Sequence, residues 1–245
     1  MFAEMMAGAG ARIVRRYPPD GASYWSQRFW DRDTLERVPV FGDQLQLVKK
    51  DIAALMTSHA QNVGTVLEFG CGTGEFTAMA AELTPATEIT ALDISPQAIE
   101  IAGKRVKHPA LKLKCGDFWA DHGLGEADMV MCVDAIHHLG NVRQVLRRLK
   151  SFMAPGAILV GNLWTIDHFH EEQRHKHGSI RHFINCARFF GGALMLRATG
   201  GRVRPASYRS HLLGTKEVEP LLLQEFGEVI EVTKARYFVS FVVKA

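Results

Sequence analysis

The sequence has few cysteines, and none of them is paired in the way that zinc ribbons or thiol exchange require. The four cysteines are Cys71, Cys115, Cys132 and Cys186, and no two stand in a CxxC spacing. Three of them lie in or beside apolar stretches, where a free thiol packs like a small hydrophobic side chain. We therefore expect a protein without a disulfide framework, in a reducing compartment.

Long apolar runs and a strong excess of one charge are also absent. No stretch approaches the roughly 18 consecutive apolar residues of a transmembrane helix, and the N-terminal segment carries an acid, Glu4, without a secretory apolar run. The net charge of +3, from 29 Lys and Arg against 26 Asp and Glu, is too small to indicate a nucleic-acid surface. We expect a cytoplasmic protein with no membrane partner.

From residue 64 onward, short apolar runs alternate with amphipathic stretches. Runs bounded by Gly, Pro and Asp are typical of buried strands, and the stretches between them have the period of helices. This alternation predicts an α/β fold of the Rossmann-like, doubly wound kind, with a mostly parallel seven-stranded sheet covered by helices. The last two runs are joined by a turn too short for a crossover helix, so they predict an antiparallel C-terminal β-hairpin.

Two segments lie outside this alternation. We expect one domain, in which residues 1–60 form a helical N-terminal cap, 62–164 the ligand-binding core, 165–206 a lid insertion, and 207–245 the closing helix and hairpin. The cap contains an aromatic cluster, and the insertion is rich in His and Arg. Both segments can fold over the crevice at the carboxyl ends of the strands, where open α/β sheets bind their ligands.

A glycine-rich loop, "VLEFGCGTGEF", follows the first predicted strand at positions 66–76. A dinucleotide-binding loop needs a glycine where Glu75 stands, and a P-loop needs a Gly-Lys-Ser or Gly-Lys-Thr ending that is missing. Glu75 also places negative charge at the helix N-terminus, where a phosphate would bind. The loop therefore suits a ligand that approaches the backbone closely but carries no phosphate.

Glu68 to Gly74, an acid two residues before the first of three alternating glycines, resembles the first motif of class I S-adenosylmethionine-dependent methyltransferases. The stretches "ALDIS", "CGDF", "DMVMCVDAIHHL" and "LKSFMAPGAILVGN" resemble later family motifs in the family's order. The resemblance covers residues 62–164 and the C-terminal hairpin. It implies S-adenosyl-L-methionine as cofactor and S-adenosyl-L-homocysteine as product, neither of which carries a phosphate.

The resemblance also implies which residues bind the cofactor. Asp93 would accept hydrogen bonds from both ribose hydroxyls, which suits a bidentate carboxylate, and Asp117 would bind the adenine amino group with Phe118 beside the ring. The alternative for Asp93 is capping of the helix that Ser95 and Pro96 open. The expected cofactor-binding set is Glu68, Gly70, Cys71, Gly72, Gly74, Asp93, Ile94, Asp117, Phe118 and Val133.

Candidate catalytic residues follow the fourth predicted strand. Methyl transfer from a sulfonium requires an in-line approach of the nucleophile away from water, and no metal is obligatory. His137 and His138 stand where the family faces the transferred methyl, and either is a candidate general base, with Asp134 as a third candidate. The alternative for the two histidines is a structural role in capping the turn or in the core.

Candidate substrate-binding residues come from the aromatic cluster, the end of the fifth strand and the insertion: Tyr24, Trp25, Trp30, Trp164 and His168. The aromatic stripe of the cap can equally belong to the core. His168, His175 and His182 would share nearly one face of a continuous helix, although Gly178 interrupts that regularity. Ligands two turns and about 10 Å apart cannot share one ion, so a solvated lid helix is favoured. We therefore expect no metal site.

We expect an enzyme that methylates an O or N atom of a small-molecule metabolite, for example in secondary metabolism, as a monomer or homodimer. A nucleic-acid methyltransferase is one alternative, favoured by the arginines of "RATGGRVRPASYR" but lacking an Asn-Pro-Pro-Tyr-like motif after the fourth strand. A non-catalytic protein that binds adenosylmethionine is the other. The acceptor itself depends on the cap and the insertion, where the family resemblance is weakest.

Overall fold

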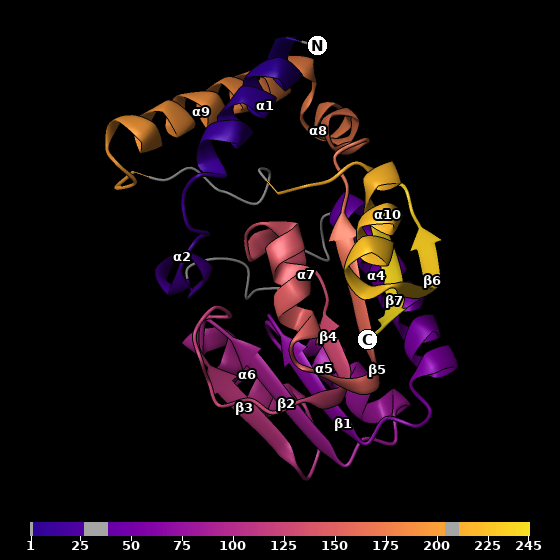
Figure 1. Cartoon of the computed structure of the whole chain (residues 1–245). Coiled ribbons are helices and arrows are strands. Elements are labelled where there is room, and N and C mark those ends of the chain that lie inside the picture. The colour runs from indigo at the N-terminus through magenta and orange to yellow at the C-terminus, as the bar shows by residue number, and fades with distance from the viewer. Residues whose placement is uncertain (1, 27–38, 204–210) are drawn as a thin grey trace.

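A computed structural model describes residues 2–26, 39–203 and 211–245, and its centre is a seven-stranded sheet of order β3-β2-β1-β4-β5-β7-β6 (Figure 1). The strands are β1 (Thr65–Phe69), β2 (Glu88–Asp93), β3 (Leu111–Cys115), β4 (Ala127–Cys132), β5 (Met153–Trp164), β6 (Glu228–Lys234) and β7 (Phe238–Lys244). Strands β1 to β5 pair in parallel. Strand β7 runs antiparallel between β5 and β6. The predicted fold class and the C-terminal hairpin are therefore confirmed.

Helices cover both faces of the sheet. The apolar side chains of α4 (Pro39–His59) and α5 (Glu75–Leu83) pack on one face, with Ile52 and Phe76 among the buried residues. Those of α7 (Val142–Lys150) and α10 (Thr215–Phe226) pack on the other, with Leu146 and Leu222 fully buried. Helix α6 (Pro96–Arg105) begins at Ser95, whose side chain accepts a hydrogen bond from the Ala98 N–H. Strands buried on both faces explain the continuous apolar runs in the sequence.

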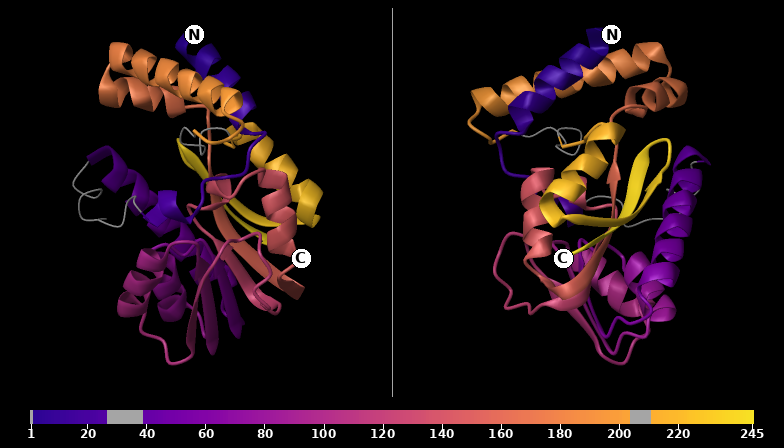
Figure 2. Two further views of the ribbon diagram at one scale, coloured as in Figure 1. Left: turned by 90° about the vertical axis from the view of Figure 1, so that its left-hand side faces the viewer. Right: turned by 45° about the vertical axis from the view of Figure 1, so that its right-hand side comes forward.

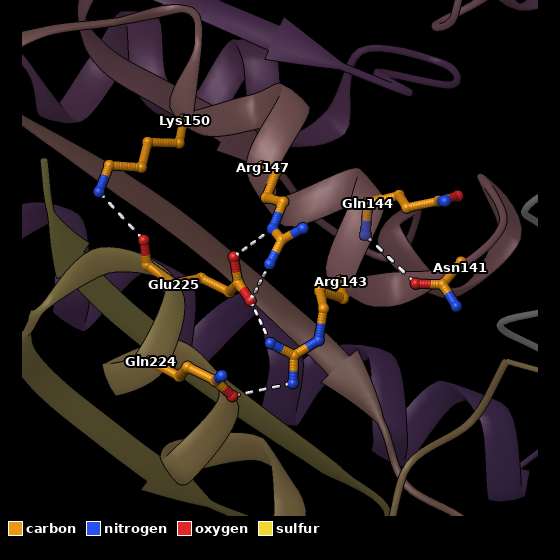
Figure 3. Close-up of polar contacts among 7 residues, drawn as sticks. All are labelled: Asn141, Arg143, Gln144, Arg147, Lys150, Gln224 and Glu225. Atoms are coloured by element: carbon orange, nitrogen blue, oxygen red, sulfur yellow. Dashed lines mark hydrogen bonds and ion pairs between the residues drawn. The ribbon is translucent and has the colours of Figure 1, made fainter.

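Polar contacts around Glu225 hold α7 and α10 together (Figure 3). Arg147 donates from Nε to the Glu225 carboxylate at 2.7 Å, Arg143 donates to the same carboxylate, and the Lys150 ammonium donates to the Glu225 carbonyl at 3.0 Å. The Arg147 hydrogen bond, with the charges of both arginines, holds the pKa of Glu225 below its ordinary value. These contacts fix the helix that precedes the hairpin.

A separate layer of helices lies beyond the carboxyl ends of the parallel strands (Figures 1 and 2). It contains α1 (Phe2–Val14), α8 (Phe169–His177) and α9 (Ser179–Ala198), and the short α2 (Ala22–Ser26) lies between it and the sheet. Helix α1 packs along α9 through a small apolar cluster that includes Ala7, Ala11 and Phe189. Across the described ranges, no helix is long and apolar enough to cross a membrane.

The insertion after β5 forms two helices rather than one. Gly178 ends α8 and begins α9 with φ +76°, a backbone conformation that favours glycine. Helix α9 then folds back against α8, so His182 does not lie on the same helix face as His168 and His175. The ring of His182 is buried instead.

Candidate functional site

The glycine loop passes directly under the turn that follows β4. Gly70 N–H donates to the Leu92 carbonyl at 2.8 Å, and the loop residues Gly70, Gly72 and Gly74 all have positive φ. A Cβ at Gly70 would lie 2.5 Å from the Ala135 Cβ, and one at Gly74 would lie 2.9 Å from the Ala102 Cβ. The loop needs glycine both for its backbone conformation and for close packing.

Asp93 holds this loop from the end of β2. Its carboxylate accepts hydrogen bonds from Gly72 N–H at 2.9 Å and from Ser95 N–H at 2.8 Å, and it is 8% exposed. Burial raises the pKa of Asp93 above its ordinary value. The helix cap itself is Ser95, so Asp93 braces the cap and the loop together while it also lines the cavity.

The turn after β4 has a strained residue at its start. Asp134 has φ +55°, which is uncommon for a residue other than glycine and concentrates at functional sites. Its carboxylate accepts from the Trp164 indole N–H at 2.8 Å and from the Asn162 amide at 3.0 Å, and its own N–H donates to the Asn162 side chain at 2.6 Å. These bonds fix Asp134 and orient the Trp164 ring.

The two histidines of this turn differ in their environments. His137 is 3% exposed, and among the described residues its Nδ1 has no hydrogen-bond partner. Burial, with a smaller contribution from the His211 charge, lowers the pKa of His137 to about 3, so the ring is neutral. His138 is half-buried and packs edge-on against Trp25, with ring centroids 4.7 Å apart.

One cavity of about 720 Å³ joins these features, and most of the expected site residues lie on it. Its floor is formed by the glycine loop, by the ends of β2 and β3, and by the turn after β4. Its roof comes from α2 and α8. The expected residues that line it are Tyr24, Trp25, Gly70, Cys71, Gly72, Asp93, Ile94, Asp117, Phe118, Val133, Asp134, His137, His138 and Trp164.

Four expected residues do not belong to this lining. Glu68 is buried beneath the loop, where its carboxylate accepts from the Thr77 hydroxyl at 2.5 Å. Gly74 packs α5 against α6. His168 has a side chain that is 46% exposed and contacts Glu171. Trp30 lies outside the described residues.

The sequence analysis missed several lining residues. Phe169, Glu172 and Gln173 of α8 reach the cavity, and Trp119 lies beside Phe118 with its indole N–H donating to the Leu139 carbonyl at 2.8 Å. The spacing of Phe169, Glu172 and Gln173 places them on one face of a helix, which is a signal the sequence contains.

The lining has an unusual balance of charge. Within the described part of the chain it contains five acids, Asp20, Asp93, Asp117, Asp134 and Glu172, and neither Lys nor Arg. Such a cavity favours ligands with positive charge and disfavours phosphates.

Comparison with known proteins agrees with this geometry. Residues 67–159 match a family model described as "Methyltransferase domain". The chain is 26% identical over 227 residues to a trans-aconitate 2-methyltransferase of Deinococcus radiodurans, covering 86% of this chain and 82% of that protein. It is 27% identical over 144 residues to a malonyl-[acyl-carrier protein] O-methyltransferase of Paenibacillus sp., covering 55% of this chain. The chain spans 27% to 52% of the length of the first curated relatives that it matches.

Solved structures share the whole fold. The plantazolicin methyltransferase BpumL, crystallised with a desmethyl plantazolicin analogue and S-adenosyl-L-homocysteine, superposes with a TM-score of 0.61 at 12% identity and covers 100% of this chain and 99% of its own. This likeness concerns the fold alone. The family match shows a methyltransferase domain at residues 67–159, and the fold and the loop geometry agree with the resemblance to the class I S-adenosylmethionine-dependent family.

Proposed function

We propose that this protein transfers a methyl group from S-adenosyl-L-methionine to an oxygen or nitrogen atom of a small-molecule metabolite. The observation that carries the proposal is the continuous cavity that runs from the glycine loop and Asp93 to His137 and His138 under the roof of α2 and α8. Its volume of about 720 Å³ is in the range of small-ligand sites. One end suits the cofactor and the other an enclosed acceptor.

The lining residues fit adenosylmethionine. The Asp93 oxygens, each already accepting one backbone N–H, keep further lone pairs for the two ribose hydroxyls. Phe118 and Asp117, which line the same cavity, would bind the adenine ring and its amino group. Because the described lining has acids and no cation, it suits a ligand with a sulfonium and an ammonium group. When bound, this cofactor supplies the electrophilic methyl group.

The protein's own part is to position the acceptor, exclude water and remove a proton. We assign the general base to His138, because the lowered pKa of His137, about 3, makes that ring a weak base near neutral pH. His137 would instead orient the acceptor through its buried Nδ1. Asp134, which Asn162 and Trp164 hold in place, keeps Trp164 against the acceptor.

The excess of acidic residues in the lining also restricts the chemical class of the acceptor. A polyanionic acceptor would face several carboxylates with no described cation in the lining, so a neutral or cationic metabolite is favoured. The same excess of acids disfavours a nucleic-acid acceptor, whose phosphates are negatively charged. Of the arginines that suggested one, Arg197 and Arg202 do not line the cavity, and Arg204 and Arg209 lie outside the described residues.

Calorimetric titration of S-adenosyl-L-homocysteine tests the cofactor assignment. Asp93→Asn should weaken binding about 10- to 100-fold, since a hydrogen bond to a charged group contributes about 1.5–3 kcal/mol. The matched control is Glu126→Gln, an exposed acid on a loop remote from the lining, which should bind like wild type. NAD should not bind. Absence of binding to folded wild-type protein would overturn the proposal.

An acceptor screen tests the reaction itself. Release of S-adenosyl-L-homocysteine would be followed with pools of amines, hydroxylated aromatics and polycarboxylates, using wild type and His138→Gln. We expect turnover with a neutral or cationic pool and a loss of about 100-fold in kcat for the variant. Turnover confined to polycarboxylates would contradict the acceptor class, and cofactor binding without any turnover would favour a non-catalytic protein.

A further inference from the structure

A cluster of metal-binding side chains lies outside the cavity, between the two helices of the insertion. It consists of His170 on α8 and of His182 and Cys186 on α9, and one donor atom from each lies within 4.8 Å of the others. None of the three lines the cavity. The methyl-transfer reaction therefore leaves this cluster without a role.

Local structure explains how these residues meet. His182 and Cys186 are four positions apart on α9, so they lie on one face of the helix. The turn at Gly178 folds α9 back against α8, which brings the ring of His170 to a centroid distance of 5.3 Å from that of His182. His168 and His175, which share the helical stripe with His182 in the sequence, are exposed and do not take part.

The distances are close to those of a zinc site. Bonds of about 2.0–2.1 Å to nitrogen and 2.3 Å to sulfur place the ligand atoms of a tetrahedral site about 3.3–3.6 Å apart. The Cys186 Sγ is 3.6 Å from the His182 Nε2, which already matches this spacing. Since the widest separation is at most 4.8 Å, a shift of about 1 Å at His170 completes the set.

The chemistry of the donors also selects the metal. One thiolate with two imidazoles suits zinc, whereas magnesium and calcium prefer oxygen ligands. His182 and Cys186 are 3% and 1% exposed, so a metal bound here would be shielded from water, and Cys186 would bind it as a thiolate.

We propose that His170, His182 and Cys186 form a structural Zn²⁺ site that joins α8 to α9. The three side chains supply three ligands, and water or a further donor takes the fourth position. Helix α8 carries Phe169, Glu172 and Gln173 into the cavity, so the metal would fix the roof over the acceptor. The proposed metal has a structural role and takes no part in the proposed methyl transfer.

Cobalt titration of the untagged, reduced, full-length protein tests this site. Co²⁺ should bind with one equivalent, give a thiolate-to-cobalt charge-transfer band in the near ultraviolet, and be displaced by Zn²⁺. Cys186→Ser should abolish the band. Cys115→Ser, at an exposed cysteine on β3, and His175→Ala, at an exposed histidine on α8, are the matched controls and should keep it.

A second variant covers the case in which Cys186→Ser does not fold, as judged by circular dichroism. His170→Ala alters a half-buried side chain and should weaken Zn²⁺ binding by about 100-fold or more. Absence of the charge-transfer band from wild type, its persistence in Cys186→Ser, or unchanged Zn²⁺ affinity in folded His170→Ala would overturn the proposal. None of these readouts depends on methyl transfer.

Discussion

The floor and the roof of the cavity are built in different ways. The floor consists of loop backbone held by short hydrogen bonds, such as Gly70 N–H to the Leu92 carbonyl at 2.8 Å, above strands that are buried on both faces. The roof, from α2 and α8, adjoins a helical layer in which α1 and α9 share a small apolar cluster separate from the two clusters of the sheet. We therefore expect the floor to tolerate less change than the helical layer above it.

The largest effect should come from adding one methyl group to the floor. Gly70→Ala places a Cβ 2.5 Å from the Ala135 Cβ at a φ of +70°. We therefore expect the free energy of unfolding to fall by about 2–5 kcal/mol, and we expect the variant to lose cofactor binding. Urea unfolding measures the change in stability, and calorimetric titration of S-adenosyl-L-homocysteine measures the change in binding.

Gly156→Ala is the control for this variant. Gly156 has φ +81°, and a Cβ there would meet no atom within 4 Å, so only the conformational cost of about 1–2 kcal/mol applies. Equal destabilisation of the two variants would show that crowding under the loop does not constrain the floor.

Acidification should destabilise the folded protein through two buried histidines, His137 and His211. Burial lowers the pKa of His137 to about 3 and that of His211 to about 4, so both rings stay neutral in the folded protein while the unfolded chain takes up protons below about 6.5. Their contribution to stability is complete above pH 6.5 and is lost as the pH falls towards these values, by up to about 1.4 kcal/mol per pH unit each.

Thermal unfolding between pH 7 and pH 5 measures this slope. His211→Gln should flatten it because one of the two proton-linked groups is gone, whereas His175→Gln, at a side chain that is 76% exposed, should leave it unchanged. A slope that does not change in His211→Gln would contradict the assignment of acid sensitivity to this buried pair.

The smallest effect should come from the same glycine-to-alanine change in α1, in the helical layer next to the roof. At Gly10 of α1 a Cβ would lie 3.1 Å from a Phe189 ring carbon and 3.3 Å from the Phe190 Cα. The helix-propensity gain of about 1 kcal/mol opposes this crowding, so stability should change by less than about 1 kcal/mol. Gly8→Ala, on the same helix with open space around it, should stabilise. A loss at Gly10 as large as that at Gly70 would erase the contrast between the two layers.

Local sequence patterns were sufficient to predict the strands, the helices between them and the position of the glycine loop. The helix "TKEVEPLLLQEF" corresponds to α10 at residues 215–226, and the short turn between the last two apolar runs predicted their antiparallel pairing. Strand period, helix period and glycine placement are properties of neighbouring residues, so they can be read without knowing what packs against them.

Side-chain orientation in the site was decided only by tertiary structure. Glu68 stands in the loop motif but bonds to Thr77 beneath the loop, and His182 shares a helical stripe with His168 until Gly178 turns it towards His170 and Cys186. Glu172 reaches the cavity because α8 folds back over the strands. The sequence by itself determined the elements and the loop chemistry, whereas the partner of each side chain depends on contacts between distant segments, which no local pattern contains.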